Sequence, residues 1–177
     1  GEFDETKVLA SLNSILDKWT SPEKYTRAAD NYAKATAQND KIITPDKKNA
    51  TMSARLNLTL KDDNGEYPAL ILGNYMLGGG FLNSRLATRI RQKDGLSYGV
   101  GSWLRASALD QSGEFGSYAI YNPENSAKLI SAYQEELAKM IKDGFTDAEL
   151  KDAISGFIQS REKNRSDDGY LVNRLSD

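Results

Sequence analysis

The chain of 177 residues is long enough for one ordinary domain with a core, or for one domain and a fragment of another. Its 23 Lys and Arg against 25 Asp and Glu give a net charge of -2, which leaves no global field to favour nucleic acid or an anionic membrane. It has no cysteine and no histidine, which excludes a disulfide framework, a Cys or His zinc site and Ser-His-Asp catalysis. No apolar run approaches the ~20 residues of a membrane-spanning helix.

The first fifty residues predict a strand end, a helix and a linker. Asp4 suits a helix N-cap. The apolar residues that follow recur on one helical face, which needs a partner to cover it; they are Val8, Leu12, Ile15, Leu16 and Trp19. The stretch 22–49 is polar and contains two prolines, so it reads as a linker between two structural units.

The middle of the chain predicts three strands and two helices. Residues 50–60 alternate apolar and polar, the period of a strand with one wet face. A helix over 69–76 ends at three glycines, and a basic amphipathic helix over 82–93 follows. Residues 96–104 and 114–121 are then predicted to pair as an antiparallel hairpin.

The last third predicts helices. Asn122 and Pro123 begin a helix that Gly144 ends, and Thr146 with Glu149 forms a capping box for the next. A polar stretch separates this helix from the start of another at 170–175. This order of elements predicts an α+β fold, with an antiparallel or mixed sheet and helices packed on one face.

The segment 77–100, LGGGFLNSRLATRIRQKDGLSYGV, contains most of the functional information. Its glycines precede a helix, as in phosphate-binding loops, but they lack the Lys-Ser/Thr of a P-loop and do not follow a strand. A tight helix-to-helix turn that needs positive φ is the simpler interpretation. Asn83 and Ser84 are expected to cap the following helix.

Four basic residues lie within nine positions of that helix: Arg85, Arg89, Arg91 and Lys93. Nucleic-acid binding would want more basic surface and aromatic stacking partners. On composition alone, a solvated helix face is the expected explanation.

This segment, together with GEFD near the start and DGFTDAEL near the end, resembles the metallopeptidase family of insulin-degrading enzyme, pitrilysin and the mitochondrial processing peptidase. In that family a domain with a His-x-x-Glu-His zinc motif faces a homologous domain that lacks it. The second domain contributes an Arg and a Tyr, seven residues apart, that bind peptide; Arg91 and Tyr98 match this pair. The resemblance implies a processing-peptidase-like domain, incomplete at its C-terminus. It would comprise residues 49–177, after a linker (21–48) and the last strand and helix of the catalytic domain (1–20).

The resemblance implies the substrate-binding half of a zinc endopeptidase, with no catalytic residue and no metal ligand in this chain. Zinc is expected in an N-terminal domain, in the same protein or a partner subunit, and a peptide or unfolded protein is the expected substrate. The alternative is a catalytically dead structural or assembly subunit. Likewise, Tyr98 has the strand parity of a core aromatic, and Arg91 could simply complement a helix dipole.

Two further expectations concern the location of the protein and the place of residues 1–19. Similarity to bacterial relatives implies a periplasmic or cell-envelope location. If the sheet lacks its final strand, residues 1–19 could occupy the vacant place in their own chain or in a neighbour's, which would make a dimer.

Overall fold

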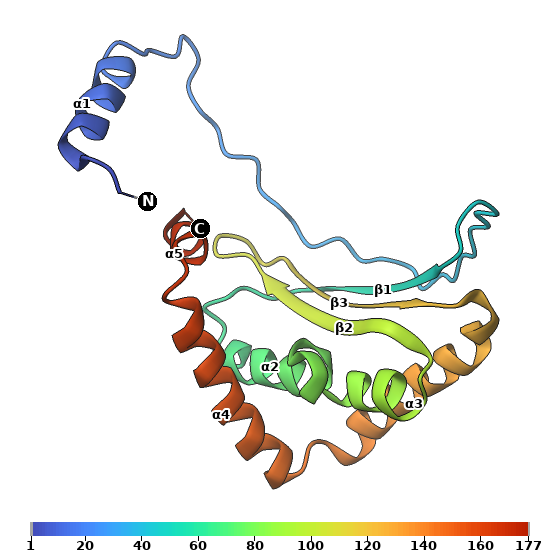
Figure 1. The fold of residues 1–177 in the computed structure, drawn as a ribbon. Coiled ribbons are helices and arrows are strands. Elements are labelled where there is room, and N and C mark those ends of the chain that lie inside the picture. Colours follow the sequence, from blue (N-terminus) through green and yellow to red (C-terminus); the bar gives the residue numbers. More distant parts are fainter. Residues whose placement is uncertain (1, 177) are drawn as a thin grey trace.

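A three-stranded antiparallel sheet is the centre of the fold in the computed structural model, which describes residues 2–176 (Figure 1). The strands are β1 (Ala50–Leu58), β2 (Ser97–Ala106) and β3 (Gly113–Tyr121), in the spatial order β1-β3-β2. The predicted strands and hairpin are confirmed, although β1 ends two residues earlier than the alternation suggests. Parallel pairing in the described chain is confined to an isolated bridge between Lys61 and Ser107.

Helices cover one face of this sheet, as predicted. The α-helices after β1 are α2 (Tyr67–Asn74), α3 (Ser126–Asp143), α4 (Asp147–Asn164) and α5 (Asp168–Ser176). The π-helical segments are η1 (Tyr75–Gly79) and η3 (Ala87–Lys93), and the 3₁₀ turns are η2 (Phe81–Asn83) and η4 (Pro123–Asn125). In Figure 1, α2, α3 and α4 lie on the side of the sheet opposite the linker. The molecule therefore has one sheet face covered by helices and one that is not.

The helix boundaries follow from their capping residues. The Asn122 side chain accepts a hydrogen bond from the Glu124 amide at 3.1 Å, at the start of η4. Gly144 ends α3 with φ of 68°. The predicted capping box of α4 is complete: the Thr146 hydroxyl accepts from the Glu149 amide at 3.2 Å, and the Glu149 carboxylate accepts from the Thr146 amide at 2.8 Å.

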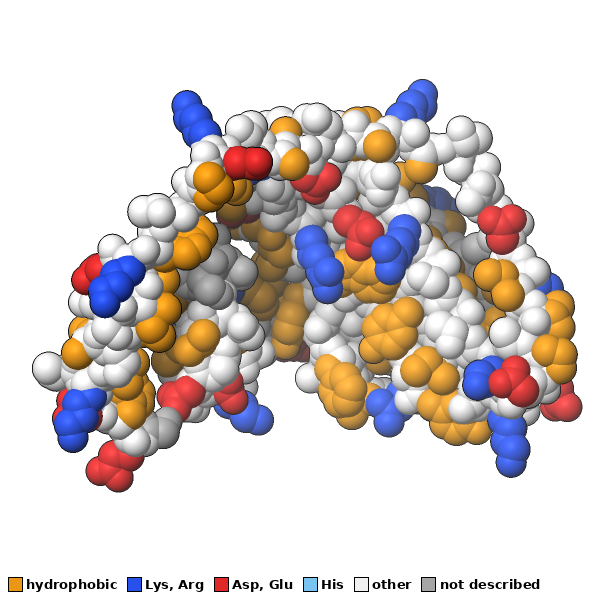
Figure 2. Space-filling model, turned by 90° about the horizontal axis from the view of Figure 1, so that it is seen from above, with side chains coloured by type: hydrophobic (Ala, Val, Ile, Leu, Met, Phe, Trp, Pro, Cys, Tyr) orange, Lys and Arg blue, Asp and Glu red, His pale blue; other side chains and the backbone are white. Residues whose placement is uncertain are grey.

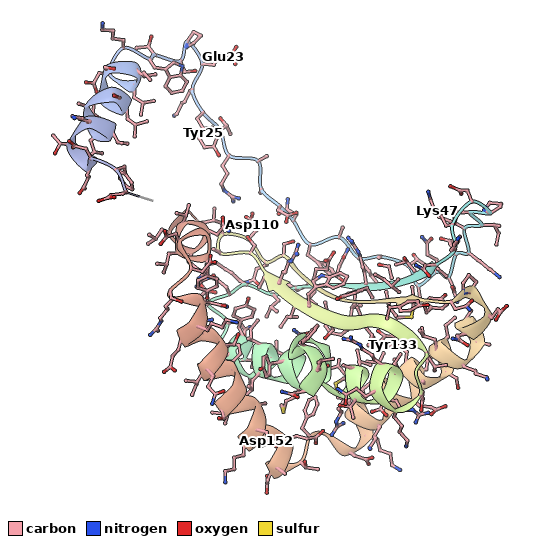
Figure 3. The ribbon with its side chains drawn as sticks, in the orientation of Figure 1. Glu23, Tyr25, Lys47, Asp110, Tyr133 and Asp152 are labelled. Carbon is pink, nitrogen blue, oxygen red and sulfur yellow. The ribbon has the colours of Figure 1, made fainter. Side chains whose placement is uncertain are left out.

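The core lies between the sheet and its helices. Its buried residues come from η1, η3 and the residue before it, β2, β3 and α3. They are Leu77, Leu86, Ala87, Ile90, Val100, Ala119, Tyr121, Leu129, Ala132 and Tyr133. A buried hydrogen bond joins the hydroxyls of Ser117 on β3 and Tyr133 on α3, and Figure 3 shows Tyr133 beneath the sheet. The apolar side chains and this bond together fix α3 against the sheet.

Polar and aromatic side chains cover part of the other sheet face. The Trp103 ring lies over Gly116, where an added Cβ would come within 2.1 Å of it. Its indole nitrogen donates to Glu114 at 2.6 Å, and the Arg55 guanidinium lies 5.6 Å from its centroid. A glycine opposite the tryptophan therefore lets the ring lie flat on the sheet.

The first helix, α1 (Glu5–Leu16), stands apart from the sheet (Figure 1). Asp4 caps it, as predicted, by accepting from the Lys7 amide at 3.1 Å. None of its residues is buried, and Trp19 just after it is 72% exposed. Seen from above, the molecule arches around a hollow, with hydrophobic side chains along the limb that holds α1 (Figure 2). The expectation that residues 1–19 fill a vacant place in their own sheet is therefore wrong.

The linker contains no regular helix or strand in the described structure between α1 and β1, but hydrogen bonds anchor its residues 27–33 to the sheet. The Arg27 guanidinium forms two hydrogen bonds of 2.6 Å with the Asp110 carboxylate, in the connection between β2 and β3. Asp110 also accepts from the Asp30 amide at 2.9 Å, and Asn57 on β1 donates to the Ala33 carbonyl at 2.9 Å. We call this set of contacts the linker clasp; Figure 3 shows Asp110 at the end of the sheet that faces the linker.

Candidate functional site

The glycine run serves close packing. An added Cβ at Gly78 would lie 2.5 Å from the Ser102 hydroxyl on β2, and one at Gly80 would lie 2.7 Å from the Tyr75 carbonyl. Gly80 has φ of -81°, and the positive φ falls on the next residue, Phe81, at 53°. The expectation that these glycines supply positive φ is wrong. Gly78 is needed because η1 approaches β2 too closely for a side chain, and Gly80 is needed because a Cβ there would meet the preceding turn at Tyr75.

The Ser-Arg-Leu motif after the glycines is structural. Ser84 is fully buried, donates to the Phe81 carbonyl at 2.7 Å and accepts from the Ala87 amide at 3.4 Å, which confirms it as a cap. Arg85 forms hydrogen bonds of 2.5 and 2.8 Å with the two carboxylate oxygens of Glu149, and its guanidinium lies 4.5 Å from the Phe145 ring centroid. This pairing lowers the pKa of Glu149 to about 2. Arg85 thus connects the central segment to the start of α4.

Arg89 is also tied to carboxylates, whereas Arg91 is not. Arg89 bonds Asp94 at 2.7 Å and Glu135 at 3.1 Å. Arg91 is exposed, lies in the last turn of η3, and forms no ion pair within residues 2–176; its guanidinium carbon lies 5.9 Å from the centroid of the Phe81 ring. Its place in the last turn also suits the helix dipole. Arg91 is therefore a cation whose hydrogen-bond donors face solvent.

Tyr98 lies at a β-bulge and is 69% exposed. The register passes from Ser97 opposite Tyr121 to Gly99 opposite Ile120, so Tyr98 is the extra residue of β2. A bulge adds one residue to its strand, so it redirects the side chain at that point and shifts the alternation of side chains between the two sheet faces. The interpretation of Tyr98 as a core aromatic is therefore wrong.

A tight turn places Arg91 and Tyr98 on adjoining elements. Gly95, with φ of 62°, makes the turn, and the Leu96 amide closes it by donating to the Ile90 carbonyl at 2.9 Å. The structure therefore brings the ends of η3 and β2 together. It leaves the Arg91 guanidinium and the Tyr98 phenol exposed on either side of the turn.

These groups can hold a polar ligand, but they lack the means to activate a nucleophile. A guanidinium donates to carbonyls and carboxylates, and a tyrosine hydroxyl can donate to a carbonyl oxygen or a developing oxyanion. Among residues 2–176, no three Asp or Glu side chains converge as a metal site would require. None of the described helices is long and apolar enough to cross a bilayer.

Sequence reasoning missed two features of the molecule, one beside Arg91 and one at the far end of β2. Phe81, exposed and in a left-handed conformation beside Arg91, has no signal in the sequence beyond its place after three glycines. The linker clasp joins Arg27 to Asp110 across 83 positions, and only the fold brings them together.

Comparison with known proteins agrees with this description. The model of the "Peptidase M16 inactive domain" family matches residues 1–157. An uncharacterized zinc protease of Streptomyces coelicolor is 34% identical over 102 residues, which are 58% of this chain and 22% of that protein. The chain thus spans less than a quarter of the length of this relative.

Solved structures show the same fold. The peptidase M16 inactive domain from Pseudomonas fluorescens has a TM-score of 0.56 and 33% identity, over 63% of this chain and 27% of that chain. The periplasmic protease PqqL from Escherichia coli has a TM-score of 0.57 and 20% identity, over 98% of this chain and 19% of that chain. The resemblance seen in the sequence is confirmed, and the chain belongs to the peptidase M16 inactive domain family.

Proposed function

We propose that this chain is the non-catalytic, substrate-binding half of a zinc-dependent endopeptidase, in which Arg91 and Tyr98 bind the peptide. Membership of an inactive-domain family supports a non-catalytic role, and the zinc protease relative supports the activity of the whole protein. The zinc and its ligands would lie in a preceding catalytic domain, in the same protein or in a partner subunit.

The observation that carries the proposal is the contrast among the arginines of the central segment. Arg85 and Arg89 are bound by carboxylates, and Arg91 is not. Its free donors can bind a peptide carbonyl or C-terminal carboxylate in a forked arrangement. The exposed phenol of Tyr98 can hydrogen-bond the carbonyl beside it, including one that gains negative charge during hydrolysis.

The same proposal assigns residues 1–20 to the preceding catalytic domain, residues 21–48 to a linker and residues 49–177 to the inactive domain. The separation of α1 from the sheet supports this division, because its apolar face has no partner among the described residues. A bacterial periplasmic or cell-envelope location is part of the proposal, supported by the periplasmic neighbour from Escherichia coli.

The test is the turnover of a fluorogenic peptide by the full-length protein. Arg91→Ala and Tyr98→Phe are each expected to lower kcat/KM by about tenfold to a hundredfold, because each removes donors to the peptide at a fixed site. Zinc content, measured by atomic emission, should stay at the wild-type value, since neither residue would touch the metal.

Matched controls separate binding from general effects of charge and surface. Lys93→Ala removes another cation near the end of η3, and Tyr25→Phe removes an exposed tyrosine hydroxyl in the linker; both should keep wild-type kcat/KM. Wild-type turnover in both Arg91→Ala and Tyr98→Phe would overturn the proposed roles. A full-length protein without zinc or turnover would instead favour the structural-subunit alternative.

A further inference from the structure

We propose that Phe81 is a specificity-determining residue of this site, whose ring contacts a large apolar side chain of the bound peptide. The proposal rests on peptide binding by Arg91 and Tyr98, and it adds the class of side chain that the site selects. Three observations carry it: the left-handed backbone of Phe81, the hydrogen bonds that hold its turn, and the exposure of its ring.

The backbone of Phe81 is in the left-handed region. Its φ is 53°, and it is the one non-glycine residue with positive φ in the described part of the chain. A residue with a Cβ is disfavoured there, and glycine or asparagine would make the same turn at lower cost. Outliers of this kind persist where the surroundings impose them, and they cluster at binding sites.

Hydrogen bonds hold the turn around Phe81. The Ser84 hydroxyl and the Ser84 amide both donate to the Phe81 carbonyl, at 2.7 and 3.2 Å. The Asn83 amide donates to the Gly80 carbonyl at 3.3 Å, and the Gln92 side chain donates to the Leu82 carbonyl at 2.7 Å. Because Ser84 is fully buried, this network fixes the backbone from which the ring projects.

The ring itself is left uncovered. Phe81 is 70% exposed and Leu82 beside it is 37% exposed, so this turn offers apolar surface to solvent. The Arg91 guanidinium carbon, 5.9 Å from the ring centroid, is close enough for a cation–π interaction. A peptide whose main chain meets Arg91 would therefore bring a side chain within reach of this ring. An apolar side chain would bury aromatic surface there, and a polar one would lose hydration without compensation.

The experiment measures binding of two labelled peptides to the full-length protein by fluorescence anisotropy. The peptides differ at one position, which holds Leu in one and Ser in the other, and this position is moved along the sequence to find the largest preference for Leu. Wild type is expected to prefer Leu by about tenfold at one position, the scale of selectivity in an apolar pocket. Phe81→Gly should abolish this preference, and it also relieves the left-handed strain, so folding is not at risk. Phe81→Leu should keep most of it.

The outcomes distinguish this proposal from the function on which it rests. Tyr25→Ala, which removes an exposed aromatic of the linker, should leave the Leu preference unchanged. If Phe81→Gly leaves the ratio of the two affinities unchanged, even when both peptides bind more weakly, the role of Phe81 is overturned while peptide binding stays in place. Absence of peptide binding in wild type, or wild-type affinity in Arg91→Ala and Tyr98→Phe, would instead overturn the proposed function itself.

Discussion

Arg85 and Arg91 occupy one short helical segment, yet their guanidinium groups have opposite environments. The Arg85 side chain is 12% exposed and bonds Glu149 through two nitrogens, with a third contact to the Gly144 carbonyl. Arg91 lies in solvent beside an aromatic ring. The basic residues of one cluster can therefore have different roles. Which of them are paired depends on carboxylates that lie elsewhere in the chain. Pairing identifies Arg85 as part of the scaffold.

The Arg85–Glu149 pair makes the stability of the fold depend on pH. The pKa of Glu149 falls from 4.5 to about 2 because Arg85 bonds the charged form. Its contribution is complete above about pH 5 and is lost as the pH falls toward 2, since the unfolded chain takes up the proton first. Glu149→Gln is expected to lower the free energy of unfolding by about 2 kcal/mol at pH 7, after allowance for a side chain that is 32% exposed.

Urea unfolding of the chain at pH 7 and pH 3 measures this effect. The difference between wild type and Glu149→Gln should shrink by more than half at pH 3. Glu135→Gln is the control, because that carboxylate is 58% exposed and its loss should cost less than about 0.5 kcal/mol at either pH. A Glu149→Gln difference that is independent of pH would contradict the assignment.

At the scale of elements, the linker clasp determines where the linker leaves the sheet. Arg27 and the Asp30 amide both bond Asp110, and these bonds lower the pKa of that carboxyl to about 2, so the clasp persists above about pH 4. Asp110→Asn removes the charge that Arg27 needs. Tryptic cleavage after Arg27 in the folded chain should then become several-fold faster, because proteolysis follows local opening.

Limited proteolysis at neutral pH, followed by mass spectrometry, gives the cleavage rates. Asp46→Asn is the matched control, since Asp46 lies in the same linker, has a side chain that is 71% exposed and pairs with its neighbour Lys47. Equal cleavage after Arg27 in wild type and Asp110→Asn would show that the clasp does not restrain the linker.

For the whole molecule, the spacing of apolar residues predicts the helices and strands well. It predicts poorly the points where a bulge or a close contact interrupts their regular pattern. The alternation along 50–58 and the capping box at Thr146 gave a strand and a helix start that the structure confirms, because these signals are local. The parity of Tyr98 misled, since a bulge is decided by pairing with β3. The glycine run predicts positive φ, yet at Gly78 the constraint comes from Ser102 on another element. In both cases the deciding contact is distant in sequence.

The separation of α1 leads to the last prediction, on how the whole protein is stabilised. Leu12 is 47% exposed and Ile15 is 68% exposed, and under the proposed division of domains another part of the full-length protein buries their apolar face. Leu12→Asp should therefore lower the melting temperature of the full-length protein by several degrees, because it places a charge in a buried contact. In the isolated chain the same variant should leave the melting of the sheet unchanged.

Calorimetry of both proteins tests this, with Ala10→Asp as the control because Ala10 lies on the opposite side of the same helix. That variant places the same residue, with the same charge and helix propensity, in α1, but it should leave the melting temperature of both proteins unchanged. Equal effects of Leu12→Asp and Ala10→Asp in the full-length protein would mean that α1 remains uncovered there. An effect of Leu12→Asp in the isolated chain that grows with protein concentration would assign the apolar face to a second copy, since oligomers are stabilised by mass action. A loss of stability in the full-length protein alone would thus place the partner of α1 in a part of the protein outside residues 1–177.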